Sequence, residues 1–182
     1  MWRRRLGKIP DGKVRFGQAR TGCSPRRQIA DQGGRSQTAR SRLPPNPALK
    51  QLEVLIGDWE VEVPQFPGPR GLATFEWLED GAYVCFHSDA PDPAPSATLV
   101  IGRDESSEVY TALHYDSRGV SRVYQMSFGG GVWKMWRQAP GFWQRFSGTL
   151  GADGSSIRAM WEKSPDGSNW EHDFDLIYNK VT

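Results

Sequence analysis

The spacing of apolar residues changes from a helical period to an alternating one close to residue 57. Five aliphatic side chains between Leu49 and Ile56 predict a short helix over residues 47–56, which Asn46 can cap and Gly57 can end. From there apolar and acidic residues alternate through Val63, which is typical of a strand with one buried and one solvated face. A short helix is therefore expected to lead directly into the first strand.

Beyond this point the alternating pattern recurs in short runs that are separated by turn residues. Glycine next to Asp or Pro stands at several of the breaks, as in residues 79–81 and 165–167, and glycine supplies the positive φ that tight turns need. The candidate strands are Gly57–Val63, Leu72–Glu79, Ala82–Ser88, Ala97–Arg103, Glu108–Tyr115, Val120–Phe128, Val132–Gln138, Phe142–Leu150, Ser156–Lys163 and Asn169–Tyr178.

Short strands joined mainly by tight turns predict an all-β fold, an antiparallel up-and-down β-barrel of about ten strands with one short capping helix. No helical stretch is long enough for the crossover that parallel strands require. A closed sheet of about eight to ten strands is wide enough to hold one small ligand. We expect this barrel to occupy residues 45–182.

Residues 1–44 have a different composition from the rest of the chain. Residues 1–42 hold 12 Lys and Arg against two Asp, whereas the remainder holds 11 basic and 19 acidic residues. Few aliphatic side chains and many Arg, Gly, Ser and Gln predict a disordered basic tail. Such a tail could bind nucleic acid, act as a transit peptide, or be an extension without a function.

Alternation along each strand also predicts which side chains face the interior. Arg122 and Tyr124 share a face, and a guanidinium suits a carboxylate, although an Arg at the rim could instead pair with a surface carboxylate. His172 lies among aromatic residues and could ligate iron, contact a polar ligand, or bond an interior partner such as a tyrosine or water. His114 is expected on the face opposite Leu113. The candidate ligand-binding residues are Trp77, Tyr115, Arg122, Tyr124, Trp161, Trp170, His172 and Phe174, with His172 as the candidate metal ligand.

Aromatic residues are dense between positions 133 and 146. Trp133 and Trp136 cannot both face inward on a regular strand, because neighbouring positions alternate between faces. One of them, together with Trp143, could form a ligand portal, contact a second copy in a homodimer, or pack on the outer wall.

The motif Gly57-Asp58-Trp59 after a short helix, followed by the strand pattern to Tyr178, resembles the calycin superfamily. This superfamily comprises lipocalins, fatty-acid-binding proteins and nitrobindin-like haem barrels, and the chain is most similar to bacterial lipocalin-like proteins. The resemblance implies a barrel that holds a hydrophobic ligand or haem. Nitrobindin-like proteins continue the motif with glycines, where this chain has Val61 and Val63, and they ligate haem through a histidine near the C-terminus, in a position similar to that of His172.

Three functions stay open from the sequence: non-enzymatic binding of a small hydrophobic ligand, a haem barrel acting on nitric oxide or peroxynitrite, and a structural or oligomerising domain with a filled interior. No catalytic motif such as Gly-x-Ser-x-Gly or His-Glu-x-x-His is present, so an enzyme is not expected. Two cysteines do not suggest a disulfide framework, and no apolar run reaches membrane-spanning length. We therefore expect a cytoplasmic protein that does not enter a membrane.

Overall fold

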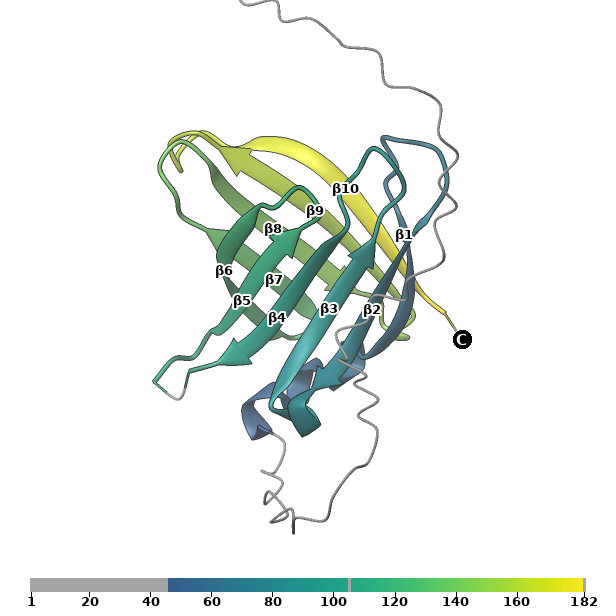
Figure 1. Ribbon diagram of the computed structural model, residues 1–182, viewed down its shortest axis with the longest axis vertical. Coiled ribbons are helices and arrows are strands. Elements are labelled where there is room, and N and C mark those ends of the chain that lie inside the picture. Colours follow the sequence, from purple (N-terminus) through teal and green to yellow (C-terminus); the bar gives the residue numbers. More distant parts are fainter. Residues whose placement is uncertain (1–45, 105, 182) are drawn as a thin grey trace, which may run out of the picture.

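The computed structural model describes residues 46–104 and 106–181, and its strands close into a β-barrel (Figure 1). Each strand pairs antiparallel with its neighbour in the chain, and β10 pairs with β1. The predicted all-β barrel with a short helix is thus confirmed, while the predictions for residues 1–44 lie outside the described residues. The strands are β1 (Gly57–Glu62), β2 (Gly71–Leu78), β3 (Tyr83–Asp89), β4 (Ala97–Arg103), β5 (Tyr110–Asp116), β6 (Ser121–Gly129), β7 (Val132–Arg137), β8 (Trp143–Leu150), β9 (Ser156–Ser164) and β10 (Glu171–Lys180).

Glycine-containing turns and the pairing of β1 with β10 set the topology of the barrel. Between β6 and β7, Gly130 and Gly131 have φ values of 58° and 75°, the positive pair that a tight hairpin turn requires. The barrel closes where Val61 of β1 lies opposite Tyr178 of β10, and the Val181 N–H donates to the Asp58 carbonyl at 2.8 Å. Because the sheet has no free edge, every inward side chain shares one interior.

A 3₁₀ helix, η1 (Pro47–Leu55), closes one end of the barrel, as predicted for residues 47–56 (Figure 1). Its fully buried residues, Leu49, Leu52 and Leu55, are spaced by three, which places them on one side of a helix with three residues per turn. The Asn46 side chain caps the start by accepting the Ala48 N–H at 3.0 Å. No helix in the described part of the chain has the length and apolar character needed to cross a membrane.

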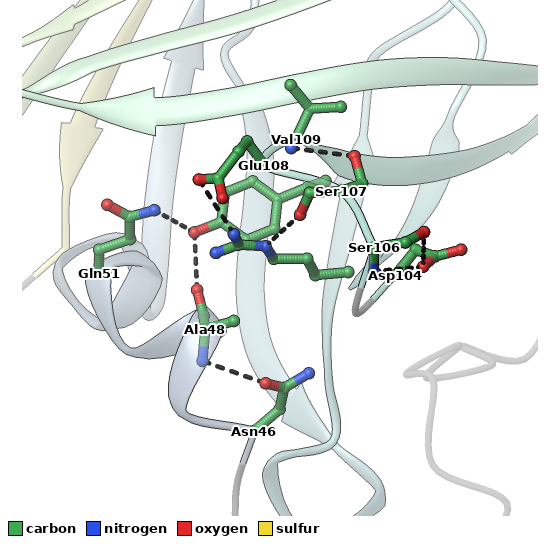
Figure 2. A network of polar contacts seen from close by, with 10 residues as sticks. Asn46, Ala48, Gln51, Asp104, Ser106, Ser107, Glu108 and Val109 are labelled. Carbon is green, nitrogen blue, oxygen red and sulfur yellow. Dashed lines mark hydrogen bonds and ion pairs between the residues drawn. The ribbon is translucent and has the colours of Figure 1, made fainter.

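Polar contacts fix η1 to the strands beneath it. The Tyr110 hydroxyl donates to the Ala48 carbonyl at 2.8 Å and accepts a hydrogen bond from Gln51 (Figure 2). The Trp59 indole N–H donates to the Leu55 carbonyl at 2.9 Å, and Lys180 Nζ lies 5.1 Å from the centre of the Trp59 ring. A second short turn of 3₁₀ helix, η2 (Glu79–Gly81), joins β2 to β3 at this end. The helix end is therefore shut by packed and hydrogen-bonded side chains.

The predicted inward face of β5 is wrong. Alternation favoured Leu113 and Tyr115 as inward residues of β5, but their side chains are 51% and 52% exposed. Tyr110 and Ala112 are buried instead, because the Tyr110 hydroxyl is bonded to η1 and sets the phase of the strand. Both faces of β5 carry apolar residues, so the pattern alone does not distinguish them.

Candidate functional site

A cavity of about 980 Å³ occupies the end of the barrel opposite η1. The proline-rich β1–β2 and β3–β4 loops border its mouth, together with residues of the β5–β6 and β7–β8 turns. Its inner wall includes Phe86, Leu99, Trp133 and Phe146. A cavity of this size argues against the alternative of an interior filled by side chains.

Three polar side chains from β6 and β8 form the main hydrogen-bonded cluster on the cavity wall. The Tyr124 hydroxyl donates to Gln144 Oε1 at 2.6 Å, and Arg122 Nη1 donates to the same oxygen at 2.9 Å. Because a guanidinium can only donate, the atom facing Arg122 is the amide oxygen of Gln144, and the amide nitrogen lies on the other side. Burial raises the pKa of Tyr124, so its hydroxyl keeps its proton.

Arg122 has no ion-pair partner among the carboxylates of the described residues. The nearby carboxylate of Asp116 is already saturated, since one oxygen accepts the backbone N–H groups of Arg118 and Val120 and the other accepts the Arg118 guanidinium at 2.6 Å. These hydrogen bonds hold the pKa of Asp116 at about 2. The Arg122 guanidinium instead lies 5.0 Å from the centre of the Phe142 ring, so the site carries a positive charge.

His114 lines the cavity, although alternation predicted that it would face outward. Its ring meets the ring of Tyr124 edge to face, with centroids 5.9 Å apart, and its Nδ1 is buried without a hydrogen-bond partner. Burial lowers the pKa of His114, and Arg122 and Arg118 lower it further while Asp116 opposes them. The imidazole is therefore neutral at physiological pH. The error follows from the wrong phase assigned to β5, and no local motif marks this histidine.

A chain of aromatic rings leads from the polar cluster towards the helix end. Tyr124 contacts Trp161 at a centroid distance of 5.7 Å, Trp161 contacts Phe146 at 5.2 Å, and Phe146 contacts Trp133 at 4.5 Å. Trp133 is buried, whereas Trp136 lies on the outer wall and donates its indole N–H to Gln125 at 2.6 Å. The cavity therefore has one polar side and a continuous aromatic side.

The structure brings Arg122, Tyr124, Trp161 and Phe174 together on the cavity wall, as the sequence predicted for their orientation. Trp77 and Tyr115 do not reach it. Trp77 shares a face with Phe75 but lies at the end of β2, where its side chain is 38% exposed. Tyr115 belongs to the misassigned face of β5.

A β-bulge in β10 explains why His172 and Trp170 are also absent from the cavity. His172 pairs with Glu162 and Phe174 pairs with Trp161, so Asp173 has no pairing partner and the alternation changes phase there. The His172 side chain is 49% exposed and its Nε2 lies 2.9 Å from Asp175 Oδ1. The Trp170 indole donates to the Gly167 carbonyl at 3.1 Å and its ring lies beneath Arg145. The predicted inward orientation of both residues is wrong.

The residues present do not fit the haem site that the resemblance implies. The His172 imidazole lies outside the cavity, and Val61 and Val63 line its wall where nitrobindin-like proteins have glycine. In the described part of the chain, no group of three or more His, Cys, Asp and Glu residues is placed to hold a metal ion. Neither a haem nor a metal ion has a ligand set at the predicted position.

Comparisons with known proteins show the fold alone. No protein-family model matches the chain, and no curated protein sequence matches it either. Among solved structures, it is similar to Rv2717c from M. tuberculosis, with a TM-score of 0.52 and 14% sequence identity over 76% of this chain and 99% of that chain. This similarity extends over the whole of the Rv2717c structure and supports the barrel architecture.

Proposed function

We propose that the protein binds a small, largely apolar molecule with an acidic group inside the barrel, without converting it chemically. The observation that carries this proposal is the Arg122 guanidinium on the wall of a large cavity, with no carboxylate partner among the described residues. Its neighbour Gln144 is buried, and its oxygen is occupied by two donors.

The polar cluster supplies hydrogen-bond donors rather than acceptors. Gln144 Oε1 accepts from both Arg122 and Tyr124, so the free capacity of the cluster consists of the remaining guanidinium N–H groups and the Gln144 amide N–H groups. A carboxylate accepts hydrogen bonds without donating any and matches a guanidinium in charge. An alcohol or amide head group carries no charge to pair with the guanidinium, so it should bind more weakly.

The rest of the cavity suits an apolar body. Trp161, Phe146 and Trp133 form the aromatic side, and burial of apolar ligand surface against such rings is favourable at roughly 25 cal/mol per Å². The calycin-like character that the sequence suggests agrees with a ligand of this kind.

The test uses displacement of the fluorescent dye 1-anilinonaphthalene-8-sulfonate from the full chain. Decanoate should displace the dye at a concentration at least about tenfold lower than decan-1-ol does, because a hydrogen-bonded ion pair forms only with the acid. Arg122→Gln should remove most of this difference. Arg158→Gln is the matched control, since Arg158 is an exposed residue of β9 that does not line the cavity. Equal displacement by acid and alcohol, or no dye binding at all, would contradict the proposal.

A further inference from the structure

One buried tyrosine has a hydroxyl that nothing in the described chain satisfies. Tyr178 of β10 is 4% exposed and lines the cavity, and burial is the one cause of its strongly raised pKa. No hydrogen bond joins its hydroxyl to any described residue. The other buried tyrosines differ, because Tyr110 bonds to η1 and Tyr124 bonds to Gln144.

Two buried tryptophans likewise differ in whether the indole N–H has a hydrogen-bond partner. Trp59 donates its N–H to the Leu55 carbonyl, whereas the buried Nε1 of Trp133 has no partner. The rings of Trp133 and Tyr178 lie 6.2 Å apart between centroids, so the two side chains are neighbours on the cavity wall. The Trp133 N–H is fully shielded, and such unpaired buried donors are rare in folded proteins because they lose their hydrogen bonds to water without replacement, whereas Tyr178 lines the cavity.

These two side chains lie at the end of the cavity nearer to η1. Along β10 the cavity is lined by Asp173, Phe174, Leu176 and Tyr178 in turn, and two residues later Lys180 donates to the Val54 carbonyl of η1 at 3.1 Å. Arg122 and His114 lie opposite each other, one residue pair away from the pair that borders the β5–β6 turn, near the mouth. The aromatic rings from Tyr124 to Trp133 connect these two ends.

We propose that Tyr178, assisted by Trp133, forms a second polar contact at the deep end of the cavity and selects ligands with a hydrogen-bond acceptor, such as a carbonyl oxygen, at the end remote from the acid. This inference rests on the proposed function and specifies its ligand class. The Tyr178 hydroxyl can donate to a ligand oxygen in the cavity, and the N–H of the neighbouring Trp133 is a second unpaired donor.

The experiment compares two acids of the same shape by isothermal titration calorimetry with the full chain. These are 4′-acetylbiphenyl-4-carboxylate and 4′-isopropenylbiphenyl-4-carboxylate, in which a CH₂ group replaces the ketone oxygen. The ketone should bind about threefold to tenfold more tightly to the unmodified protein, which is the range expected for one net hydrogen bond. Tyr178→Phe should abolish most of this preference while leaving the affinity of the isopropenyl acid unchanged.

A second measurement separates a ligand contact from a structural role. Tyr178→Phe removes only the oxygen, so the melting temperature of the free protein should stay equal or rise, because no native hydrogen bond is lost. Tyr115→Phe is the matched control on the outer wall and should change neither property. In ¹⁵N-labelled protein, the Trp133 indole signal, identified by its loss in Trp133→Phe, should shift more with the ketone than with the isopropenyl acid.

The outcomes distinguish the two proposals. Equal affinities for both acids, with binding still weakened by Arg122→Gln, would overturn the deep contact and leave the proposed function intact. A marked fall in melting temperature in Tyr178→Phe would also overturn it, because the hydroxyl would then have a partner within the protein. Failure of both acids to bind would contradict the proposed function and this inference together.

Discussion

Asp116 is a buried carboxylate that organises the β5–β6 turn at the mouth of the cavity. Its two oxygens accept hydrogen bonds from two backbone N–H groups and from the Arg118 guanidinium, and its own backbone pairs with Val120 across the turn. The Arg118 side chain itself is 57% exposed, so the backbone contacts are the better shielded ones. Asp116 therefore holds in place the ends of β5 and β6, the two strands that carry His114 and Arg122.

The pH dependence of stability should reveal this carboxylate. The pKa of Asp116 is about 2 in the folded protein and about 3.9 in an unfolded chain, so it stabilises the fold above pH 4 and this contribution disappears as the pH falls towards 2. Asp116→Asn should lower the free energy of unfolding at pH 7 by about 1–2 kcal/mol, and the difference should shrink between pH 4 and pH 2. Urea unfolding at several pH values measures both.

Glu108→Gln serves as the control for this series, because the Glu108 side chain is fully exposed and should contribute little. A destabilisation by Asp116→Asn that is the same at pH 7 and pH 2 would show that the charge of Asp116 is not responsible.

At the residue scale, four candidate residues show where sequence reasoning succeeds and where it fails. The shared face of Arg122 and Tyr124 was predicted correctly, because β6 has a clear contrast between its two faces. His114 and His172 were assigned to the wrong faces. The first error comes from apolar residues on both sides of β5, and the second from the bulge beside Asp173. A bulge depends on the packing of neighbouring strands, which no local pattern records.

At the scale of elements, the β1–β2 loop is anchored to β10 by one side chain. Pro64 comes shortly after the end of β1, and proline has no N–H to continue the backbone pairing with β10. The side-chain amide of Gln65 hydrogen-bonds to β10 instead. Its oxygen accepts the Asp175 N–H at 3.1 Å, and its nitrogen donates to the Asp175 carboxylate at 2.5 Å. His172 contacts the other oxygen of that carboxylate. The loop carries Phe66, which borders the mouth and is 73% exposed.

Removing this anchor should change the rate of ligand exchange more than the affinity. Gln65→Ala leaves the cavity wall intact but frees the loop, so the association and dissociation rates of the anilinonaphthalene dye should both rise about twofold to tenfold, with little change in their ratio. Stopped-flow fluorescence measures these rates. Gln125→Ala, which removes a hydrogen bond to Trp136 on the outer wall, should leave them unchanged. A change in affinity alone would contradict a gating role for the loop.

The elements themselves were largely predictable. Glycine-containing turns separate the strands, and the helix has both its cap and its three-residue leucine spacing in the sequence. The cavity was not predictable, because its size depends on how the side chains of Trp133 and Trp161 fill the interior. Pairs across the barrel such as Tyr124 and Gln144 come from strands that do not neighbour each other, so their contact is also absent from any local pattern.

At the scale of the whole molecule, the closed sheet should tolerate a new chain order. A flexible glycine–serine linker can join Val181 to Asn46, and new ends can be opened between Gly130 and Gly131, where a Cβ would meet no atom within 4 Å at Gly130 and only Leu150 at 3.9 Å at Gly131. The permuted protein should keep the far-ultraviolet circular dichroism spectrum, a cooperative unfolding transition and dye binding. Loss of the cooperative transition would show that the β6–β7 turn is needed for the fold to form.

The pairing of β1 with β10 also bears on how the chain reaches this structure. Nine of the ten strand pairs join neighbours in the sequence, whereas Val61 and Tyr178 come from opposite ends of the barrel sequence. Bringing them together has the largest loop-closure entropy of any pair, so hairpins can form early while barrel closure comes late. Tyr178 belongs to this β1–β10 pairing, which forms last. The same strand that presents an unpaired hydroxyl to the cavity is thus the one whose docking completes folding, and a ligand held there would favour the closed barrel over its open precursors.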